Sequence, residues 1–333
     1  MSRSIALTMG EPGGIGAEIA IKAYRALAPA GPSFFYCGSE ASIKAAARQL
    51  DAEIPIVSIS APGQAAEAFA RGLPVYEIAL NGAVVPGSAL PEHADAVIES
   101  IETAMSFAMT GQASAIVTSP IQKHSLHEAG FGYPGHTEFL EALSGPGTRA
   151  VMMLQGAGLR VVPVTIHEPL RAAISRLTSA LIAQTGLAAA QGLRRDFGIA
   201  SPRIAVAGLN PHAGESGDLG DEEQRIVAPA IAVLQAAGIE AFGPLSPDTM
   251  FTARARAGYD AALCLYHDQA LIPLKTLAMH EGVNVTLGLP VVRTSPDHGT
   301  ALDIAGKGLA DPSSLIEALK LAAILARRRE KSS

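Results

Sequence analysis

Short apolar runs that stop abruptly at polar residues recur along this chain. Ala261–Leu265 runs into Tyr-His-Asp-Gln, while Val283–Leu287 and Leu289–Val292 repeat the pattern, the last of them ending in Arg293. Apolar runs of this length are typical of strands that are buried on both faces of a sheet. Open α/β sheets carry their binding and catalytic residues at the carboxyl ends of the strands. We therefore expect the chemistry of this protein at strand ends.

The remaining pattern alternates predicted strands with predicted helices. Further strands are predicted at Ile5–Met9, Phe34–Gly38, Ala115–Pro120, Arg160–Ile166 and Arg203–Gly208. Apolar spacing predicts helices at about 17–27, 91–110 and 315–325, and turn signals predict helix starts near residues 136 and 221. This alternation predicts an α/β fold with a mostly parallel sheet, and 333 residues favour two domains.

Composition narrows the class of protein. With 48% hydrophobic and 17% charged residues, the chain reads as a folded globular enzyme rather than a disordered protein. Its net charge of −6 argues against nucleic-acid binding. Cys37 and Cys264 lie inside apolar runs, which predicts two core thiols rather than a disulfide or a zinc knuckle. No apolar run reaches about 18 residues and the N-terminal residues lack a signal-peptide pattern, so we expect no membrane span and a cytoplasmic location.

A glycine-rich segment, Gly10-Glu-Pro-Gly-Gly-Ile-Gly16, separates the first predicted strand from the first predicted helix. Two interpretations remain open. Backbone N–H groups of such a turn can bind a phosphate at the helix N-terminus. Alternatively, the glycines serve only a tight strand-to-helix turn. The spacing does not match the dinucleotide fingerprint, and the carboxylate of Glu11 is unfavourable beside a phosphate.

Three histidines follow three separate predicted strands. His167 ends the strand at 160–166, His212 follows the strand at 203–208, and His267 follows the strand at 261–265. Converging imidazoles would suit a borderline divalent cation, although three unrelated polar strand caps would give the same pattern. The glycine-rich segment 214–220 is expected to be a mobile loop, and the acidic start of the next helix at 221–223 suits the helix dipole.

A second group of polar residues surrounds a predicted helix start. His136 and Thr137 follow the turn Tyr133-Pro-Gly, and Lys123 lies shortly before them in the chain. A helix N-terminus beside a lysine favours an anionic ligand.

With these residues in place, the chain resembles the 4-hydroxythreonine-4-phosphate dehydrogenase family of the vitamin B6 pathway over nearly its whole length. The shared motifs are Thr8-Met-Gly-Glu-Pro-Gly-Gly-Ile-Gly16, Pro134-Gly-His-Thr-Glu138, Gly208-Leu-Asn-Pro-His-Ala-Gly-Glu215, Tyr266-His-Asp-Gln269, Gly282-Val-Asn-Val-Thr-Leu-Gly288 and Arg293-Thr-Ser-Pro-Asp-His-Gly-Thr300. So many motifs in one order make a chance match improbable.

The resemblance implies a set of site residues. One divalent metal (zinc, magnesium or cobalt) is implied at His167, His212 and His267, and the phosphorylated substrate at His136, Thr137, Lys275, Asn284 and Arg293. The loop carrying His298, Gly299, Thr300 and Asp303 resembles the nucleotide-binding loop of isocitrate and isopropylmalate dehydrogenases. For proton transfer our own candidate is Lys275, with Asp248 and Asp268 as weaker candidates. Histidine ligands suit a softer ion such as zinc.

The resemblance also implies an architecture. The expected fold is the two-domain α/β/α type of isocitrate and isopropylmalate dehydrogenases, in which the chain returns to its first domain at the end. We place the first domain at 1–128 and 270–333, and the second, with the metal site and the contacts of a homodimer, at 129–269.

The implied reaction is the NAD- or NADP-dependent oxidation of 4-phosphooxy-L-threonine to 2-amino-3-oxo-4-phosphooxybutanoate, which decarboxylates to 3-amino-2-oxopropyl phosphate in pyridoxine 5'-phosphate biosynthesis. Two alternatives stay open. A paralogue acting on 4-phosphorylated threonate or erythronate would use the same ligands. A phosphotransacetylase-like acyltransferase would share the fold, but it would need neither the three histidines nor the loop that begins at His298.

Overall fold

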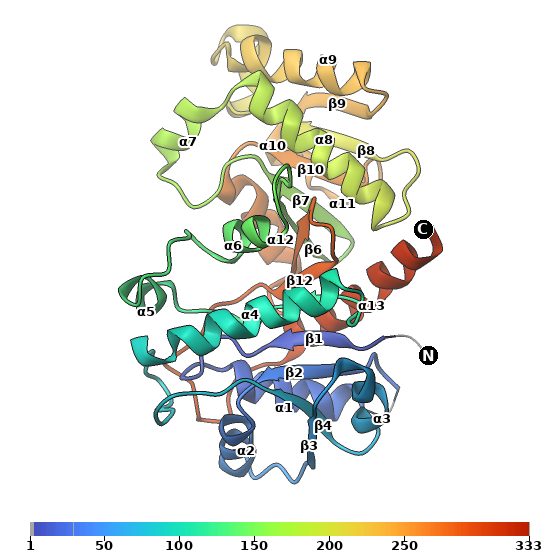
Figure 1. The fold of residues 1–333 in the computed structure, drawn as a ribbon. Helices are drawn as coiled ribbons and strands as arrows, with labels where there is room; N and C mark the ends of the chain where they lie inside the picture. Colours follow the sequence, from blue (N-terminus) through green and yellow to red (C-terminus); the bar gives the residue numbers. More distant parts are fainter. Residues whose placement is uncertain (1–2, 29, 333) are drawn as a thin grey trace. The chain divides into compact units, whose positions relative to one another are not determined.

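The computed structural model of the protein describes residues 3–28 and 30–332 (Figure 1). The chain forms two compact units. Unit 1 combines Met1–Ala150 with Leu289–Glu330, and unit 2 is formed by Val151–Gly288. The chain thus returns to its first unit near its end. Both crossings lie further along the chain than the domain boundaries at 128 and 270 that we placed from the sequence.

Unit 1 contains a fully parallel sheet in the order β3-β4-β2-β1-β5-β12. Its strands are β1 (Ile5–Thr8), β2 (Phe34–Gly38), β3 (Ile56–Ile59), β4 (Leu73–Glu77), β5 (Ile116–Val117) and β12 (Arg293–Pro296). Its α-helices are α1 (Gly16–Leu27), α2 (Glu40–Gln49), α3 (Ala65–Phe69), α4 (Ala94–Met109), α5 (Lys123–Glu128), α6 (His136–Leu143) and α13 (Ser313–Ser332).

Helix α4 is fixed to the sheet of unit 1 by one buried hydroxyl as well as by apolar packing. In Figure 1 it crosses in front of β1, with α1 behind the strands. Ser100 on α4 accepts a hydrogen bond from the Met9 backbone N–H at 2.9 Å and donates to the Cys37 carbonyl at 2.6 Å. One hydroxyl therefore satisfies the ends of two neighbouring strands, which a purely apolar helix face could not do.

One predicted strand of unit 1 is wrong. The apolar residues 289–292 form no strand, and the strand is Arg293–Pro296, polar in sequence but buried at every position. Arg293 and Thr294 pair in parallel with Ile116 and Val117 of β5, and the Thr294 hydroxyl donates to the Ala318 carbonyl of α13 at 2.9 Å. The tertiary partner, rather than local hydrophobicity, makes this segment a strand.

Unit 2 contains a mixed sheet in the order β11-β6-β7-β10-β8-β9. The pairs β11–β6 and β6–β7 are antiparallel, and the remaining pairs are parallel. Its strands are β6 (Val151–Gly156), β7 (Leu159–Pro163), β8 (Arg203–Ala207), β9 (Glu240–Leu245), β10 (Ala261–Cys264) and β11 (Val283–Leu287). Its α-helices are α7 (Leu170–Arg176), α8 (Ser179–Arg195), α9 (Ala228–Ala236), α10 (Pro247–Met250), α11 (Ala253–Arg256) and α12 (His267–Ala278).

Helix α12 belongs to the core of unit 2, which explains why the chain returns to unit 1 only at residue 289. It packs on β6, β7 and β10, and Ala270 and Leu274 are fully buried in the same apolar cluster as Val161 and Cys264. Both cysteines are buried as predicted, and burial raises the pKa of each thiol. The predicted mostly parallel α/β class is confirmed.

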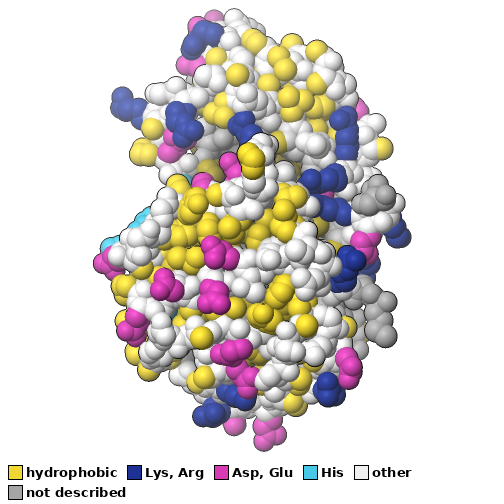
Figure 2. All heavy atoms as spheres, in the orientation of Figure 1, with side chains coloured by type: hydrophobic (Ala, Val, Ile, Leu, Met, Phe, Trp, Pro, Cys, Tyr) yellow, Lys and Arg dark blue, Asp and Glu magenta, His cyan; other side chains and the backbone are white. Residues whose placement is uncertain are grey.

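The surface carries charges of both signs. On the face shown in Figure 2, lysine and arginine side chains are scattered among aspartate and glutamate and form no continuous positive area. In the part of the chain that the structure describes, no helix is both long enough and apolar enough to cross a membrane.

Candidate active site

The three histidine-bearing strands of unit 2 are neighbours. Strand β10 pairs in parallel with β7 on one side and with β8 on the other. Carboxyl ends of parallel strands lie at one edge of a sheet, so the segments that follow them emerge together. His267 begins α12 directly after β10, while His167 and His212 lie in the segments that follow β7 and β8. The sequence-level expectation of a common edge is met by the topology.

Two of these imidazoles lie close together. The ring centroids of His167 and His267 are 5.7 Å apart. A cavity of about 340 Å³ opens beside them and is lined also by Thr165, Leu170 and Tyr266. His267 Nδ1 lies 2.7 Å from a carboxylate oxygen of Asp268, a contact of the kind that fixes the tautomer of a metal-binding histidine.

The structure does not bring His212 together with His167 and His267 as a set of three metal ligands among the described residues. Among the described residues, no three His, Cys, Asp or Glu side chains are near enough to one another to hold a metal ion. The donor chemistry of His167 and His267 fits a borderline divalent cation. The part of His212 in such a site therefore stays a prediction.

His212 lies in a left-handed turn rather than in a loop without regular structure. Five successive residues, 212–216, have φ between 43° and 78°, and only Gly214 among them is a glycine. Each non-glycine residue in this conformation costs about 1–2 kcal/mol. His167 also has a positive φ of 45°. Strain of this kind is maintained only where surrounding contacts impose it, and it clusters at functional sites.

Side-chain hydrogen bonds connect the three strand ends. The Thr165 hydroxyl, after β7, donates to the Leu265 carbonyl, after β10, at 2.9 Å. The Leu265 N–H donates to Gln269 Oε1 at 2.7 Å, and Gln269 Nε2 donates to the Gly208 carbonyl, after β8, at 2.7 Å. Our sequence reasoning gave Thr165 and Gln269 no role. Only the motif Tyr266-His-Asp-Gln269, which we did quote, carried a signal for the glutamine.

The acidic start of the helix at 221–223 has a different role from the one expected. The carboxylate of Glu223 accepts from the backbone N–H groups of Leu209 and Asn210, each at 2.7 Å, and from Asn210 Nδ2 at 2.9 Å. Burial would raise the pKa of Glu223, but the N–H donors of Asn210 and Leu209 outweigh it and the pKa is lowered. Glu223 therefore binds the loop before His212 as well as complementing a helix dipole.

Unit 1 supplies a buried cation beside a buried imidazole. Arg293 is 3% exposed, and its Nε donates to the Thr118 hydroxyl at 3.1 Å. Burial lowers the pKa of Arg293 to about 10, so the guanidinium stays charged at neutral pH. Burial, together with Arg293 and Lys123, holds the pKa of His136 well below its usual value, so this ring is neutral. Although His136 as a residue is half-buried, its Nε2 is enclosed and has no hydrogen-bond partner among the described residues.

The helix start at His136 has the expected form. Gly135 is the N-cap of α6, and a Cβ at that position would lie 3.3 Å from Lys123 Nζ. Thr137 in the first turn is half-buried. This arrangement of a lysine, an arginine and a helix N-terminus around a neutral imidazole suits a phosphate or carboxylate group.

The predicted nucleotide loop follows β12. His298 Nδ1 lies 3.0 Å from the Gly299 carbonyl, and its Nε2 is buried with no partner among the described residues. The Thr300 carbonyl accepts from the Ile15 N–H at 3.1 Å, while Asp303 is exposed. The role of this loop in nucleotide binding stays a prediction.

The glycine-rich turn at 10–16 is structural. The N–H groups of residues 11, 13, 14 and 15 donate to the Pro120 carbonyl, the Glu11 carboxylate, the Glu11 carbonyl and the Thr300 carbonyl. A Cβ on Gly13 would lie 1.9 Å from the Ser88 carbonyl oxygen. Since these N–H groups already have acceptors, the structure favours the tight turn over a phosphate cradle.

The remaining predicted residues lie on unit 2. Lys275 is half-buried on α12, and Asn284 on β11 has a buried Oδ1 without a partner among the described residues. Asp248 and Asp268 are exposed; the first accepts from the Ser246 hydroxyl and the second contacts His267. Both carboxylates have a local partner, and their part as proton carriers stays a prediction.

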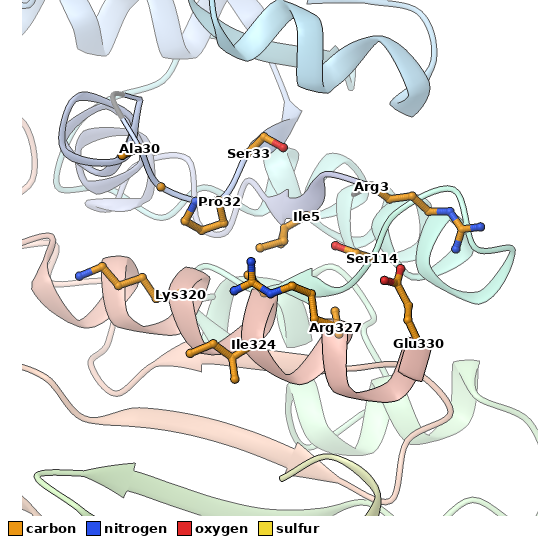
Figure 3. A pocket seen from close by; sticks show the side chains of 13 residues that line it. Arg3, Ile5, Ala30, Pro32, Ser33, Ser114, Lys320, Ile324, Arg327 and Glu330 are labelled. Carbon is orange, nitrogen blue, oxygen red and sulfur yellow. The ribbon is translucent and has the colours of Figure 1, made fainter. Parts of the chain in front are cut away.

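Another cavity, of about 440 Å³, lies in unit 1 (Figure 3). Its walls are Ile5 and Ser33 at the amino ends of β1 and β2, and one face of α13 that includes Lys320 and Arg327. These are the opposite strand ends from those that precede the glycine-rich turn. The cavity is therefore distinct from the candidate site.

Comparisons with known proteins agree on one family. A family model described as "Pyridoxal phosphate biosynthetic protein PdxA" matches residues 31–322. A 4-hydroxythreonine-4-phosphate dehydrogenase of Caulobacter vibrioides is 51% identical over 333 residues, covering 98% of this chain and 99% of the relative. The crystal structure of 4-hydroxythreonine-4-phosphate dehydrogenase from Klebsiella pneumoniae is 40% identical with a TM-score of 0.88, covering 98% of this chain and 100% of that one.

A more distant neighbour bears on the fold alone. A branched-chain phosphotransacylase from Enterococcus faecalis V583 has a TM-score of 0.55 at 16% identity, covering 96% of this chain and 99% of that chain. The predicted fold of the isocitrate and isopropylmalate dehydrogenase type is confirmed by the neighbours together.

The glycine-rich turn yields a prediction about pH. Glu11 is 3% exposed, and burial raises the pKa of its carboxyl although the Gly13 N–H and the Ser125 hydroxyl oppose the shift. A raised folded-state pKa means that the contribution of Glu11 to stability is full below its unfolded pKa and is lost as pH rises through the folded value. Glu11→Gln, uncharged at every pH, should therefore gain stability relative to the wild type between about pH 4 and about pH 8. Denaturant unfolding at both pH values measures this difference.

The matched control is Glu67→Gln, because the side chain of Glu67 is 84% exposed. It should shift the free energy of unfolding by less than about 0.5 kcal/mol. An identical pH dependence of unfolding for Glu11→Gln and the wild type would contradict the prediction.

Proposed function

Because the chain belongs to the family of the pyridoxal phosphate biosynthetic protein PdxA, we propose that it is a metal-dependent NAD(P) dehydrogenase acting on 4-phosphooxy-L-threonine. The observation that carries the proposal is the pair of imidazoles His167 and His267, 5.7 Å apart on neighbouring parallel strand ends. His212 is proposed as the third ligand. A phosphotransacylase that shared only the fold would not need this pair of histidines.

The anionic parts of the substrate are proposed to bind the cationic residues of unit 1. Arg293 offers a planar guanidinium for bidentate contact with a phosphate or carboxylate. His136, neutral through its lowered pKa, offers an enclosed Nε2 that can donate to such a group in one tautomer. Thr137, Asn284 and Lys275 complete the proposed contacts.

The bound cofactors would supply the Lewis-acid and hydride-transfer chemistry. A divalent cation lowers the pKa of an alcohol and stabilises an enolate, and a nicotinamide accepts hydride. Lys275 is the proposed carrier of the proton that leaves the hydroxyl, with Asp248 and Asp268 as weaker candidates. The loop with His298, Gly299, Thr300 and Asp303 is proposed to orient the nucleotide.

The balance of the reaction is simple. With NAD(P)+ bound, hydride from the substrate carbon C3 would reduce the nicotinamide and the hydroxyl proton would be released, which would give 2-amino-3-oxo-4-phosphooxybutanoate. A β-keto acid loses CO₂ and takes up a proton to give 3-amino-2-oxopropyl phosphate.

We also propose that the protein acts as a homodimer in the cytoplasm. Unit 2 exposes large apolar side chains on the helices that follow His167 and begin at His267: Leu170, which lines the histidine cavity, is 55% exposed, Ile174 on the same helix is 42% exposed, and Ile272 on α12 is 65% exposed. Exposed apolar residues of this size at a strand-end site are typical of an interface.

The metal proposal predicts the behaviour of His212→Ala. Losing one of three ligands should weaken Zn²⁺ or Co²⁺ binding by more than about a hundredfold, which is the upper range for losing a partner outside the ligand shell. NAD(P) reduction with 4-phosphooxy-L-threonine should fall with it, while the fold persists. Equilibrium dialysis and absorbance of the reduced nicotinamide measure both.

The control is His124→Ala, since His124 has an 83% exposed side chain and pairs with Glu128. Full metal binding by the His212→Ala variant would show that His212 is not a metal ligand.

Faster turnover of 4-phosphothreonate than of the amino substrate would identify the paralogous activity, and acyl transfer to coenzyme A would identify the transferase.

The anion site predicts the behaviour of Arg293→Ala. A charge-assisted hydrogen bond contributes about 1.5–3 kcal/mol, so KM for the phosphorylated substrate should rise about ten- to a hundredfold. Arg293→Lys keeps the charge but lacks the planar guanidinium, so its KM should lie between those of the wild type and Arg293→Ala. Steady-state kinetics and thermal unfolding measure the effect, with the exposed Arg71→Ala as control. An unchanged KM in a folded Arg293→Ala variant would place the anion site elsewhere.

The interface proposal predicts that Ile272→Asp dissociates the protein. A charge in place of a buried apolar side chain would leave an uncompensated carboxylate at the interface. Sedimentation velocity should show a dimer for the wild type and a monomer for the variant. Leu309→Asp on unit 1, where Leu309 is 68% exposed, should remain dimeric. A monomeric wild type would refute the proposal.

A further inference from the structure

The loop that leads into the left-handed turn of His212 is bound to one buried carboxylate, that of Glu223. Glu223 is 4% exposed and accepts three hydrogen bonds from two residues of the preceding loop, Leu209 and Asn210. Glu223 also begins a π-helical turn, Glu223–Val227, immediately before α9. Single π-helical turns are rare and occur frequently at functional sites.

The packing around this carboxylate leaves no room for side chains. A Cβ on Gly214 would lie 2.6 Å from Glu223 Oε2, and one on Gly208 would lie 3.3 Å from Oε1. Gly208 and Gly214 flank His212 in the chain, so the backbone comes close to the same carboxylate on both sides of His212. A carboxylate here fixes the backbone on either side of the imidazole.

A second contact joins this turn to the segment of His267. Gln269 is 6% exposed and bridges the Leu265 N–H and the Gly208 carbonyl through two hydrogen bonds of 2.7 Å. The backbone preceding His212 is therefore held from two sides, by Glu223 and by the helix that carries His267.

We infer that Glu223 is a positioning residue for the metal centre, holding the strained turn so that His212 is presented in a fixed place. The inference rests on the proposed metal function and adds a residue that acts through His212. A carboxylate is required because all its oxygens accept hydrogen bonds here. A glutamine would face the Asn210 amide with an NH₂ group, donor against donor.

Two measurements on Glu223→Gln test this role. In the metal-free protein, the amides of Leu209 and Asn210 should exchange with deuterium about tenfold faster, because the neutral amide oxygen that replaces Oε1 is a weaker hydrogen-bond acceptor than a carboxylate oxygen. Zn²⁺ affinity, measured by equilibrium dialysis on the full chain, should fall about ten- to a hundredfold. Asp221→Asn is the matched control, because its exposed carboxylate on the same segment pairs with Arg225 and should change neither value.

The outcomes separate the inference from the proposed function. Unchanged exchange or unchanged Zn²⁺ affinity in Glu223→Gln, with a wild type that binds Zn²⁺, overturns the positioning role alone. A wild type that binds no Zn²⁺ overturns the metal site and the inference with it. If Glu223→Gln does not fold, Glu223→Asp, whose shorter side chain cannot reach both loop residues, takes the same two measurements and is read in the same way.

Discussion

The parallel pairing of β10 with both β7 and β8 is the constraint on which the chemistry of unit 2 depends. Parallel strands must end at the same edge, so the residues that follow them are brought together whatever their separation in sequence. His167 and His267 meet there although 100 residues of chain divide them. The pairing creates the edge, and the local contacts then decide how each side chain is presented.

Those local contacts are polar and buried. Thr165, Gln269 and Glu223 each hold a backbone group of a neighbouring strand end, and each would be costly to leave without its partner. They allow the chain to keep four non-glycine residues in left-handed conformation at 212–216, which no local sequence preference favours. Strain at the histidine turn is thus balanced by hydrogen bonds that involve no proposed ligand.

Unit 1 differs from unit 2 in the polar groups that it buries. Its sheet is wholly parallel, and its strand ends bury a guanidinium and enclose an imidazole nitrogen instead of exposing a pair of imidazoles. Burial makes the charge of Arg293 effective by removing competing water, and the same burial keeps His136 neutral. The glycine-rich turn serves this edge indirectly, since its N–H groups hold Pro120 and Thr300.

The sequence by itself determined the α/β class, the buried cysteines, and the strands that precede each histidine, because long apolar runs and helical spacing are local properties. Through motif resemblance it also identified the family. It failed at Arg293–Pro296, whose strand forms by pairing with β5, and at Glu223, whose partner lies on another loop. Only the tertiary structure decided these, because a buried polar group takes its role from the partner it meets in space, and no pattern along the chain names that partner.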